Sequence, residues 1–108
     1  MEDDKQMAEY IYSILLLKPT ILMSWGFTSP IAIKMGLKFS VSGFLLKGTV
    51  QILYNCGSDS FDLTFYNEDG TVRNSIKGIF FDELVNVIDE QVERVENYID
   101  RVKNEYNN

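Results

Sequence analysis

Apolar and polar residues recur with two different periods along this chain, and each change of period marks the boundary of an element. Near the N-terminus the apolar positions have helical spacing, at Met7, Ile11, Ile14 and Leu15. Asp3 or Asp4 can cap such a helix, and we expect Pro19 to end it because the residue before a proline is pushed out of helical geometry. The pattern therefore predicts an N-terminal helix over residues 1–18.

Residues 20–77 follow the period of two that is typical of strands. A first strand is predicted over Ile21–Phe27, with Trp25 as a core anchor on its large-residue face. Pro30 fits the first position of one helical turn that Gly36 closes. Apolar residues then alternate with polar ones in four further runs: Leu37, Phe39, Val41 and Leu45; Val50, Ile52 and Tyr54; Phe61, Leu63 and Phe65; and Val72 and Ile76.

Turn residues separate these runs. Lys47-Gly48 marks one predicted reversal, and the sequence NCGSD at residues 55–59 supplies the next. NEDG at residues 67–70 is a hairpin signal because Asp and Gly adopt the turn dihedrals that flanking strands require. Consecutive strands joined by short turns predict an antiparallel meander of four or five strands in sequence order.

A long C-terminal helix is predicted over residues 82–106, capped by Asp82. Its apolar positions form a heptad pattern: Phe81, Val85, Ile88, Val92, Val95, Ile99, Val102 and Tyr106. About 24 helical residues reach roughly 36 Å, whereas the strands reach only about 20 to 27 Å, so the helix should overhang its sheet. We therefore predict one α+β domain, residues 1–108, with both terminal helices packed on one face of the sheet and the overhang covered by the first helix or a second subunit.

The charge distribution narrows the range of partners. The formal net charge is −6, with eight acidic residues between positions 82 and 108 and only four lysines and no acid between positions 10 and 58. This balance disfavours phosphate backbones and anionic membranes, so we expect no direct nucleic-acid binding and no membrane association. Cys56 is the only cysteine, and the apolar run at residues 13–17 is too short to span a bilayer, so we expect a cytoplasmic protein.

Residues for catalysis or metal binding are scarce. The chain has no histidine, which is the commonest general base and metal ligand at neutral pH. Cys56 therefore has no histidine to activate it, and Asp59 and Asp62 lack the spacing of a calcium loop. No glycine-rich turn joins a strand to a following helix as a phosphate loop does. We predict no enzyme activity, no cofactor and no metal site.

Apolar surface is the remaining functional signal. We predict two candidate interface sets, the outward-facing residues of three successive strands and the end of the C-terminal helix: Phe44, Leu53 and Tyr66; and Val95, Ile99, Val102 and Tyr106. The preferred function is a non-enzymatic protein–protein interaction module that forms a homo-oligomer. Identifying a binding partner is the most direct test of this function. Two alternatives stay open: an acidic inhibitor that mimics nucleic acid, and a small-ligand binder with a pocket near Trp25 between sheet and helices.

Several short runs also carry a resemblance. They are Ser24-Trp25-Gly26, Gly43-Phe44, Lys47-Gly48, Tyr54-Asn55, Asp69-Gly70 and Val87-Ile88-Asp89. Together they resemble a group of small uncharacterised proteins from gut bacteria and their mobile elements, over roughly residues 24 to 89. The resemblance implies a small cytoplasmic protein and no catalytic activity.

Overall fold

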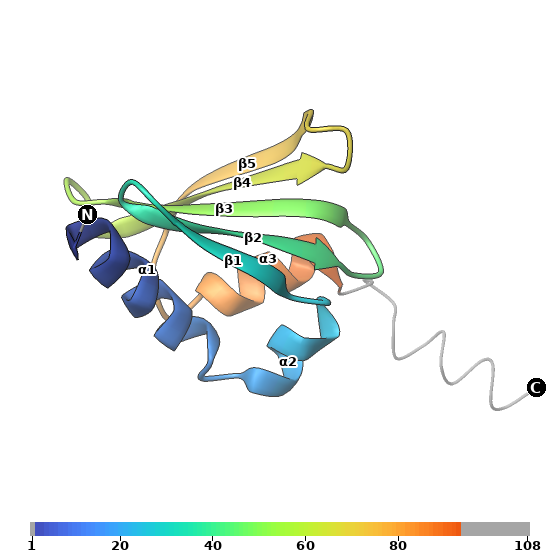
Figure 1. The fold of residues 1–108 in the computed structure, drawn as a ribbon, viewed down its shortest axis with the longest axis horizontal. Coiled ribbons are helices and arrows are strands. Elements are labelled where there is room, and N and C mark those ends of the chain that lie inside the picture. Colours follow the sequence, from blue (N-terminus) through green and yellow to red (C-terminus); the bar gives the residue numbers. More distant parts are fainter. Residues whose placement is uncertain (1, 94–108) are drawn as a thin grey trace, which may run out of the picture.

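The computed structural model describes residues 2–93, with side chains from residue 5 onward. The helices and strands occur in the order α1 (Glu2–Leu15), α2 (Pro19–Ser24), β1 (Thr28–Ile33), β2 (Gly36–Ser42), β3 (Lys47–Asn55), β4 (Ser60–Asn67), β5 (Val72–Ile79) and α3 (Leu84–Val92). The five strands form one antiparallel sheet in the order β1-β2-β3-β4-β5 (Figure 1). The predicted α+β class and the meander in sequence order are confirmed.

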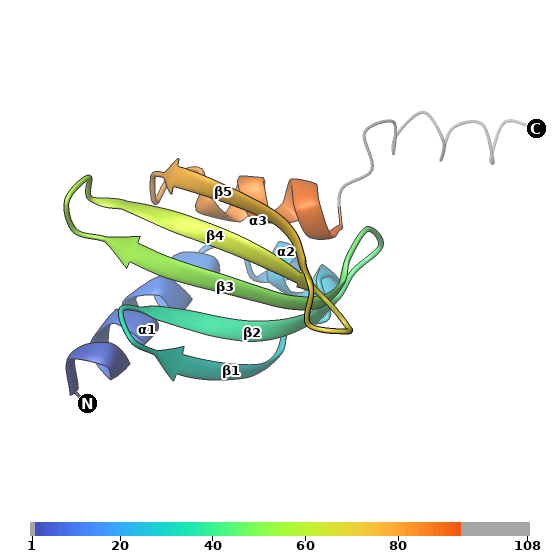
Figure 2. The same cartoon turned by 90° about the horizontal axis from the view of Figure 1, so that it is seen from above.

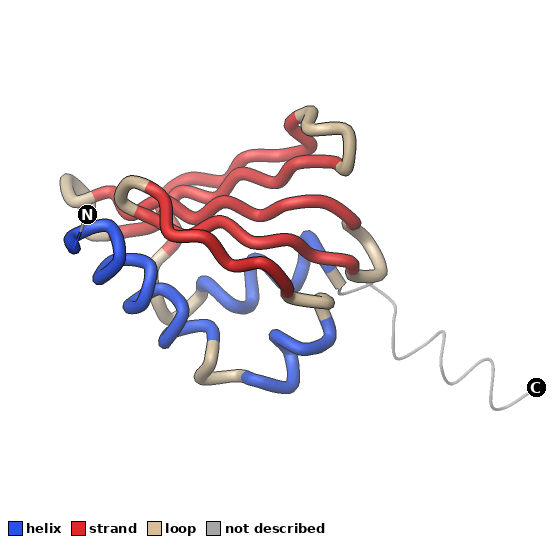
Figure 3. Tube along the Cα trace, viewed as in Figure 1, coloured by secondary structure: helices blue, strands red, loops and turns tan. Residues whose placement is uncertain are grey.

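The helices and the sheet form two layers. Figures 1 and 2 show α1, α2 and α3 on one side of the sheet, and Figure 3 shows the strands uncovered on the other side. Residues from both layers form a single buried apolar cluster, whose largest members on the strands and helices are Phe39, Ile52, Leu63, Phe65, Ile11, Leu15, Leu84 and Ile88. Alternate residues of β2, β3 and β4 enter this cluster, as the period of two predicts.

The predicted strand over Ile21–Phe27 is wrong, because these residues belong largely to α2. Pro19 lies in the first turn of α2, where a proline needs no hydrogen-bond partner for its nitrogen. It therefore opens a second helix, and α1 already ends at Leu15. Leu22 and Trp25 both point into the core from positions three residues apart, which is a helical spacing.

The predicted helical turn that starts at Pro30 is also wrong, because Pro30 lies in β1. This strand is at the sheet edge, and its pairing with β2 is irregular between Thr28 and Ile31, which is where a proline can be tolerated. Gly36 begins β2 instead of closing a helix. A Cβ atom at Gly36 would collide with the carbonyl oxygen of Ile52 on β3, so only glycine allows this close pairing.

The turns at residues 55–59 and 67–70 lie where the sequence predicts them, but the predicted turn at Lys47-Gly48 does not. Lys47 is the first residue of β3, and the chain reverses over residues 43–46. Leu45 consequently lies in this connection and not on a strand. The adjacent Leu46 is the residue that enters the core from this connection.

β5 departs from the predicted register at its first residue. Phe65 pairs with Asn74 but Tyr66 pairs with Val72, so β5 has one extra residue between these pairs. Such a bulge reverses the face of the sheet to which the residues beyond it point. Val72, which was predicted to face inward, therefore faces outward and is 61% exposed. Ile76, opposite Leu63, does pack against the core as predicted.

The C-terminal helix is described only as far as Val92, so residues 94–106 of the predicted helix lie outside the described residues. Val85, Ile88 and Val92 are buried as the heptad pattern predicts, but Phe81, the first position of that pattern, precedes α3 and is exposed. The predicted cap at Asp82 is wrong, because α3 starts after Glu83 and no side chain caps it. Within residues 2–93, no helix is both long and apolar enough to cross a membrane.

Candidate functional site

Trp25 joins α2 to α3 through a buried hydrogen bond. Its indole ring is fully buried, 6.4 Å from the ring of Phe39 and nearly parallel to it. The indole Nε1–H donates to Oδ1 of Asp89 on α3 at 2.9 Å. The burial of Trp25 that the sequence predicts is confirmed, but the residue follows α2 and does not lie on a strand. Because its only polar hydrogen is already donated, Trp25 contributes packing and not a polar contact to any ligand.

The connection between β2 and β3 holds the end of α3. The backbone N–H groups of Leu45 and Leu46 both donate to the carbonyl oxygen of Val92, at 2.8 and 3.2 Å. The backbone N–H of Phe44 donates to Oε2 of Glu93. The bonds to Val92 satisfy a carbonyl oxygen at the helix C-terminus that the helix itself leaves unpaired. A Cβ atom on Gly43 would lie 2.5 Å from the same Val92 oxygen, so the close contact depends on glycine.

The side of α3 that points away from the sheet adjoins the α1–α2 turn. Leu84, Val85, Ile88, Asp89 and Val92 are the buried residues of α3. Positions 83, 86 and 90 therefore share the opposite side of the helix, since residues three or four apart lie on one face, whereas Val87 is half-buried and packs against the core. Lys18 Nζ in the α1–α2 turn donates to Oδ1 of Asn86 at 3.4 Å. This hydrogen bond brings the turn next to the outward side of α3.

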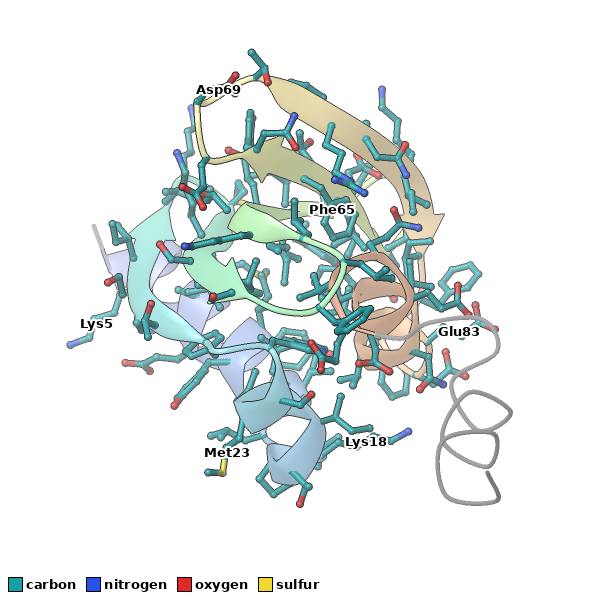
Figure 4. All side chains as sticks on the ribbon, turned by 90° about the vertical axis from the view of Figure 1, so that its right-hand side faces the viewer. Lys5, Lys18, Met23, Phe65, Asp69 and Glu83 are labelled. Carbon is teal, nitrogen blue, oxygen red and sulfur yellow. The ribbon has the colours of Figure 1, made fainter. Side chains whose placement is uncertain are left out.

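Exposed apolar residues flank this contact. Leu17, the neighbour of Lys18, is 75% exposed, and Phe81, three residues before the start of α3, is 58% exposed. We call the following set the helix-layer surface: Leu17, Lys18, Phe81, Glu83, Asn86 and Glu90. Figure 4 shows Lys18 and Glu83 on the helix side of the molecule, far from Asp69 at the β4–β5 hairpin. The surface thus combines apolar side chains with exposed carboxylates.

The structure does not gather the three predicted strand residues into one patch. Phe44 is in the β2–β3 connection and not on a strand. Leu53 pairs with Asp62, whereas Tyr66 pairs with Thr49, four residues away along β3 and therefore about 13 Å distant. Leu53 instead lies over Gly36.

Tyr66 has a contact of its own, because Nζ of Lys38 lies 5.6 Å from the centre of its ring. The other predicted interface residues lie outside the described residues: Val95, Ile99, Val102 and Tyr106.

The polar groups of the strand turns bond mainly to one another. Tyr54 donates its hydroxyl hydrogen to Oδ1 of Asp59 at 2.7 Å, and this hydrogen bond raises the pKa of Tyr54. Asp69 accepts hydrogen bonds from the hydroxyl and the backbone N–H of Thr71, which lower the pKa of Asp69. Cys56 is exposed in the β3–β4 turn. In the part of the chain that the structure describes, no three Cys, Asp or Glu side chains are grouped so that they could hold a metal ion.

Sequence reasoning missed Leu17 and Phe81 as site residues. Both carried a signal, because the run Leu15-Leu16-Leu17 is longer than one face of a helix can bury and Phe80-Phe81 is a pair of adjacent aromatic residues. Their proximity to the same helix depends on the fold and is not readable from the sequence.

Comparisons with known proteins identify no relative of this chain. A scan against family models finds no match, and searches of curated proteins and of solved structures also find none.

Proposed function

We propose that this protein is a non-enzymatic protein–protein interaction module that self-associates through the helix-layer surface. The observation that supports this proposal is the exposure of Leu17 and Phe81 beside the acidic outward side of α3. Burying a Leu or Phe side chain contributes about 1.5 to 3 kcal/mol relative to leaving it exposed. Two such residues near one helix give association a driving force that scattered single residues do not.

The acidic residues of α3 favour a protein contact over mimicry of nucleic acid. Of the five acids between positions 82 and 93, Asp89 binds the Trp25 indole and Glu93 binds the Phe44 backbone. Two of the five carboxylates therefore serve the fold itself. Asp82 and Glu83, which directly follow Phe81, are exposed and suit the polar rim of a protein interface.

Sedimentation equilibrium of the full chain over a range of concentrations tests the proposal. We expect a mass above the 12.5 kDa of one chain. Replacing Leu17 and Phe81 together by serine should shift the equilibrium to the single chain. Ile31→Ser with Val72→Ser is the matched control, because Ile31 and Val72 are 58% and 61% exposed but lie on strands at the two edges of the sheet.

Two results would contradict the proposal. One is a wild-type protein that has the mass of a single chain at every concentration. The other is a surface variant that associates as strongly as the control variant. Circular dichroism of each variant establishes that it is folded, so that loss of association is not confused with loss of structure.

A further inference from the structure

We propose that the side chain of Asn74 closes the β5 edge of the sheet, and that two copies of the chain pair through this edge when that side chain is removed. The inference goes beyond the proposed function, because it concerns a sheet edge and not the helix-layer surface. Among residues 2–93, β5 is the last strand of the sheet, so no strand of the same copy pairs with its outer side (Figure 2). An open edge of this kind is a template for a strand of another chain.

The two edges of the sheet differ in how they exclude a further strand. At the β1 edge, Pro30 has no N–H to donate, and the pairing with β2 is irregular between Thr28 and Ile31. β5 contains no proline over its eight residues, Val72–Ile79, and most of them are exposed. The β5 edge therefore needs another means of exclusion.

The regularly paired part of β5 is centred on Ser75. Pairing with β4 is irregular toward both ends of the strand, and only Asn74, Ser75 and Ile76 pair with three consecutive residues of β4. The backbone N–H of Ser75 donates to Oδ1 of Asn74 at 2.8 Å. Alternate residues of an edge strand direct this group away from the neighbouring strand, and Ser75 is one of them. The Asn74 oxygen thus takes the place of the carbonyl oxygen that an added strand would supply.

α3 holds the Asn74 amide in this position. Nδ2 of Asn74 donates to Oε1 of Gln91 at 3.0 Å, and Val92, the next residue of the helix, is buried in the core. The amide has an acceptor end and a donor end, and both are engaged, which fixes its orientation. An added strand would therefore have to displace a side chain that the helix layer holds at the centre of the edge.

The charges of β5 oppose the same pairing. Two copies that pair in antiparallel fashion with Ser75 at the centre place Arg73 of each copy opposite Lys77 of the other. Both side chains are exposed. Like charges directly opposite each other on neighbouring strands destabilise the pair, and cations on an edge strand are a common means of keeping sheets apart. Asn74 and the two cations therefore act against one and the same contact.

Removal of the Asn74 amide tests the closure. Asn74→Val should be made in the Leu17→Ser, Phe81→Ser background, so that the helix-layer surface does not contribute to association. Valine favours strands and has no polar group, and we expect association in sedimentation velocity at concentrations at which the background protein is a single chain. Asn74→Asp is the matched control, because its carboxylate still accepts the Ser75 hydrogen. This control should remain a single chain.

Charge reversal then tests the register of the pairing. With Asn74→Val present, Lys77→Glu sets an acid opposite Arg73 of the other copy, at two equivalent places in the dimer. We expect the dissociation constant to fall roughly tenfold, and Arg73→Glu should have the same effect. Both reversals together bring like charges opposite each other again, so the dissociation constant should return to that of Asn74→Val alone.

A measurement without any change to β5 tests the hydrogen bond itself. Amide hydrogen exchange of the background protein, followed by NMR, should show the Ser75 N–H protected by Asn74. Gln91→Ala should speed the exchange of this one hydrogen, because the Asn74 amide then loses the contact that holds it. Circular dichroism establishes that each variant is folded.

The outcomes separate this inference from the proposed function. An Asn74→Val variant that stays a single chain at every concentration, as Asn74→Asp is expected to do, would overturn the closure. So would a Ser75 amide that exchanges as fast as an unprotected one. A double charge reversal that associates as strongly as either single reversal would overturn the pairing centred on Ser75. A wild type that is a single chain would overturn the proposed function and leave this inference intact.

Discussion

The buried hydrogen bond between Trp25 and Asp89 is expected to stabilise the fold measurably, because it connects two helices through the core. The indole Nε1–H and the Asp89 carboxylate are 2.9 Å apart, and both side chains are buried. A hydrogen bond to a charged group contributes about 1.5 to 3 kcal/mol, and a buried donor left without an acceptor costs about 1 to 3 kcal/mol. Asp89→Ala should therefore lower the free energy of unfolding by roughly 2 to 4 kcal/mol.

Asp89→Asn is the matched control for this change. The amide oxygen of asparagine can still accept the indole hydrogen, so the variant should lose only the charge-assisted part of the bond, about 1 kcal/mol. Urea unfolding should be followed by far-UV circular dichroism, because Trp25 is the only tryptophan and some variants remove it. Equal m-values across the series establish that the extent of unfolding is unchanged.

A double-mutant cycle isolates the pair from the other contacts of each residue. It compares Trp25→Phe, Asp89→Ala and the double variant with the wild type, and we expect a coupling energy of about 1 to 2 kcal/mol. A coupling energy near zero would refute the reasoning, since the two losses would then be independent. Equal destabilisation by Asp89→Ala and Asp89→Asn would also contradict it, because the acceptor would then not matter.

Three further predictions concern the connections and the register of the sheet. Gly43→Ala should destabilise the protein by about 1 to 3 kcal/mol in urea unfolding, because the new methyl group meets the last turn of α3. Gly57→Ala should cost less, because there the new methyl group meets only the side-chain oxygen of Asn55, at 3.3 Å. Thr71→Val removes a hydrogen bond to Asp69, so an NMR titration should show the pKa of Asp69 rising toward its ordinary value. Folding lowers this pKa, so the stabilisation by Asp69 is present at a pH above its unfolded-state pKa. That stabilisation is lost as the pH falls through the folded-state pKa. Val72→Ser should change the unfolding free energy by less than about 0.5 kcal/mol, and a loss typical of a core residue would show that β5 has no bulge at its start.

The candidate surface shows which kind of information a sequence lacks. Apolar runs at Leu15–Leu17 and Phe80–Phe81 were visible as excess hydrophobic residues, but they are more than 60 residues apart. Their relation is established by the Lys18–Asn86 contact, which exists only once the helices pack on the sheet. The predicted strand patch failed for the converse reason. Its members alternate correctly in sequence, yet a connection and the register of β3 and β4 separate them.

Elements in which one local pattern persists could be predicted from the amino-acid sequence. Alternation over β2, β3 and β4 predicted the core residues Phe39, Ile52 and Leu63, because a strand with one buried face must repeat every two residues. The turn residues at positions 55–59 and 67–70 predicted the reversals for an equally local reason, since they adopt the required backbone dihedrals.

Short elements and interruptions of a pattern depend instead on packing and strand pairing. Residues 19–25 have too few turns to display a helical period, and the burial of Leu22 and Trp25 against the core fixes them as helix. Pro30 is compatible with a strand only because β1 lies at the sheet edge. The exposure of Val72 follows from one extra residue in β5, which only the pairing with β4 defines. Local periodicity therefore specified the central sheet, whereas pairing and packing between distant segments specified its edges and the surface of its helices.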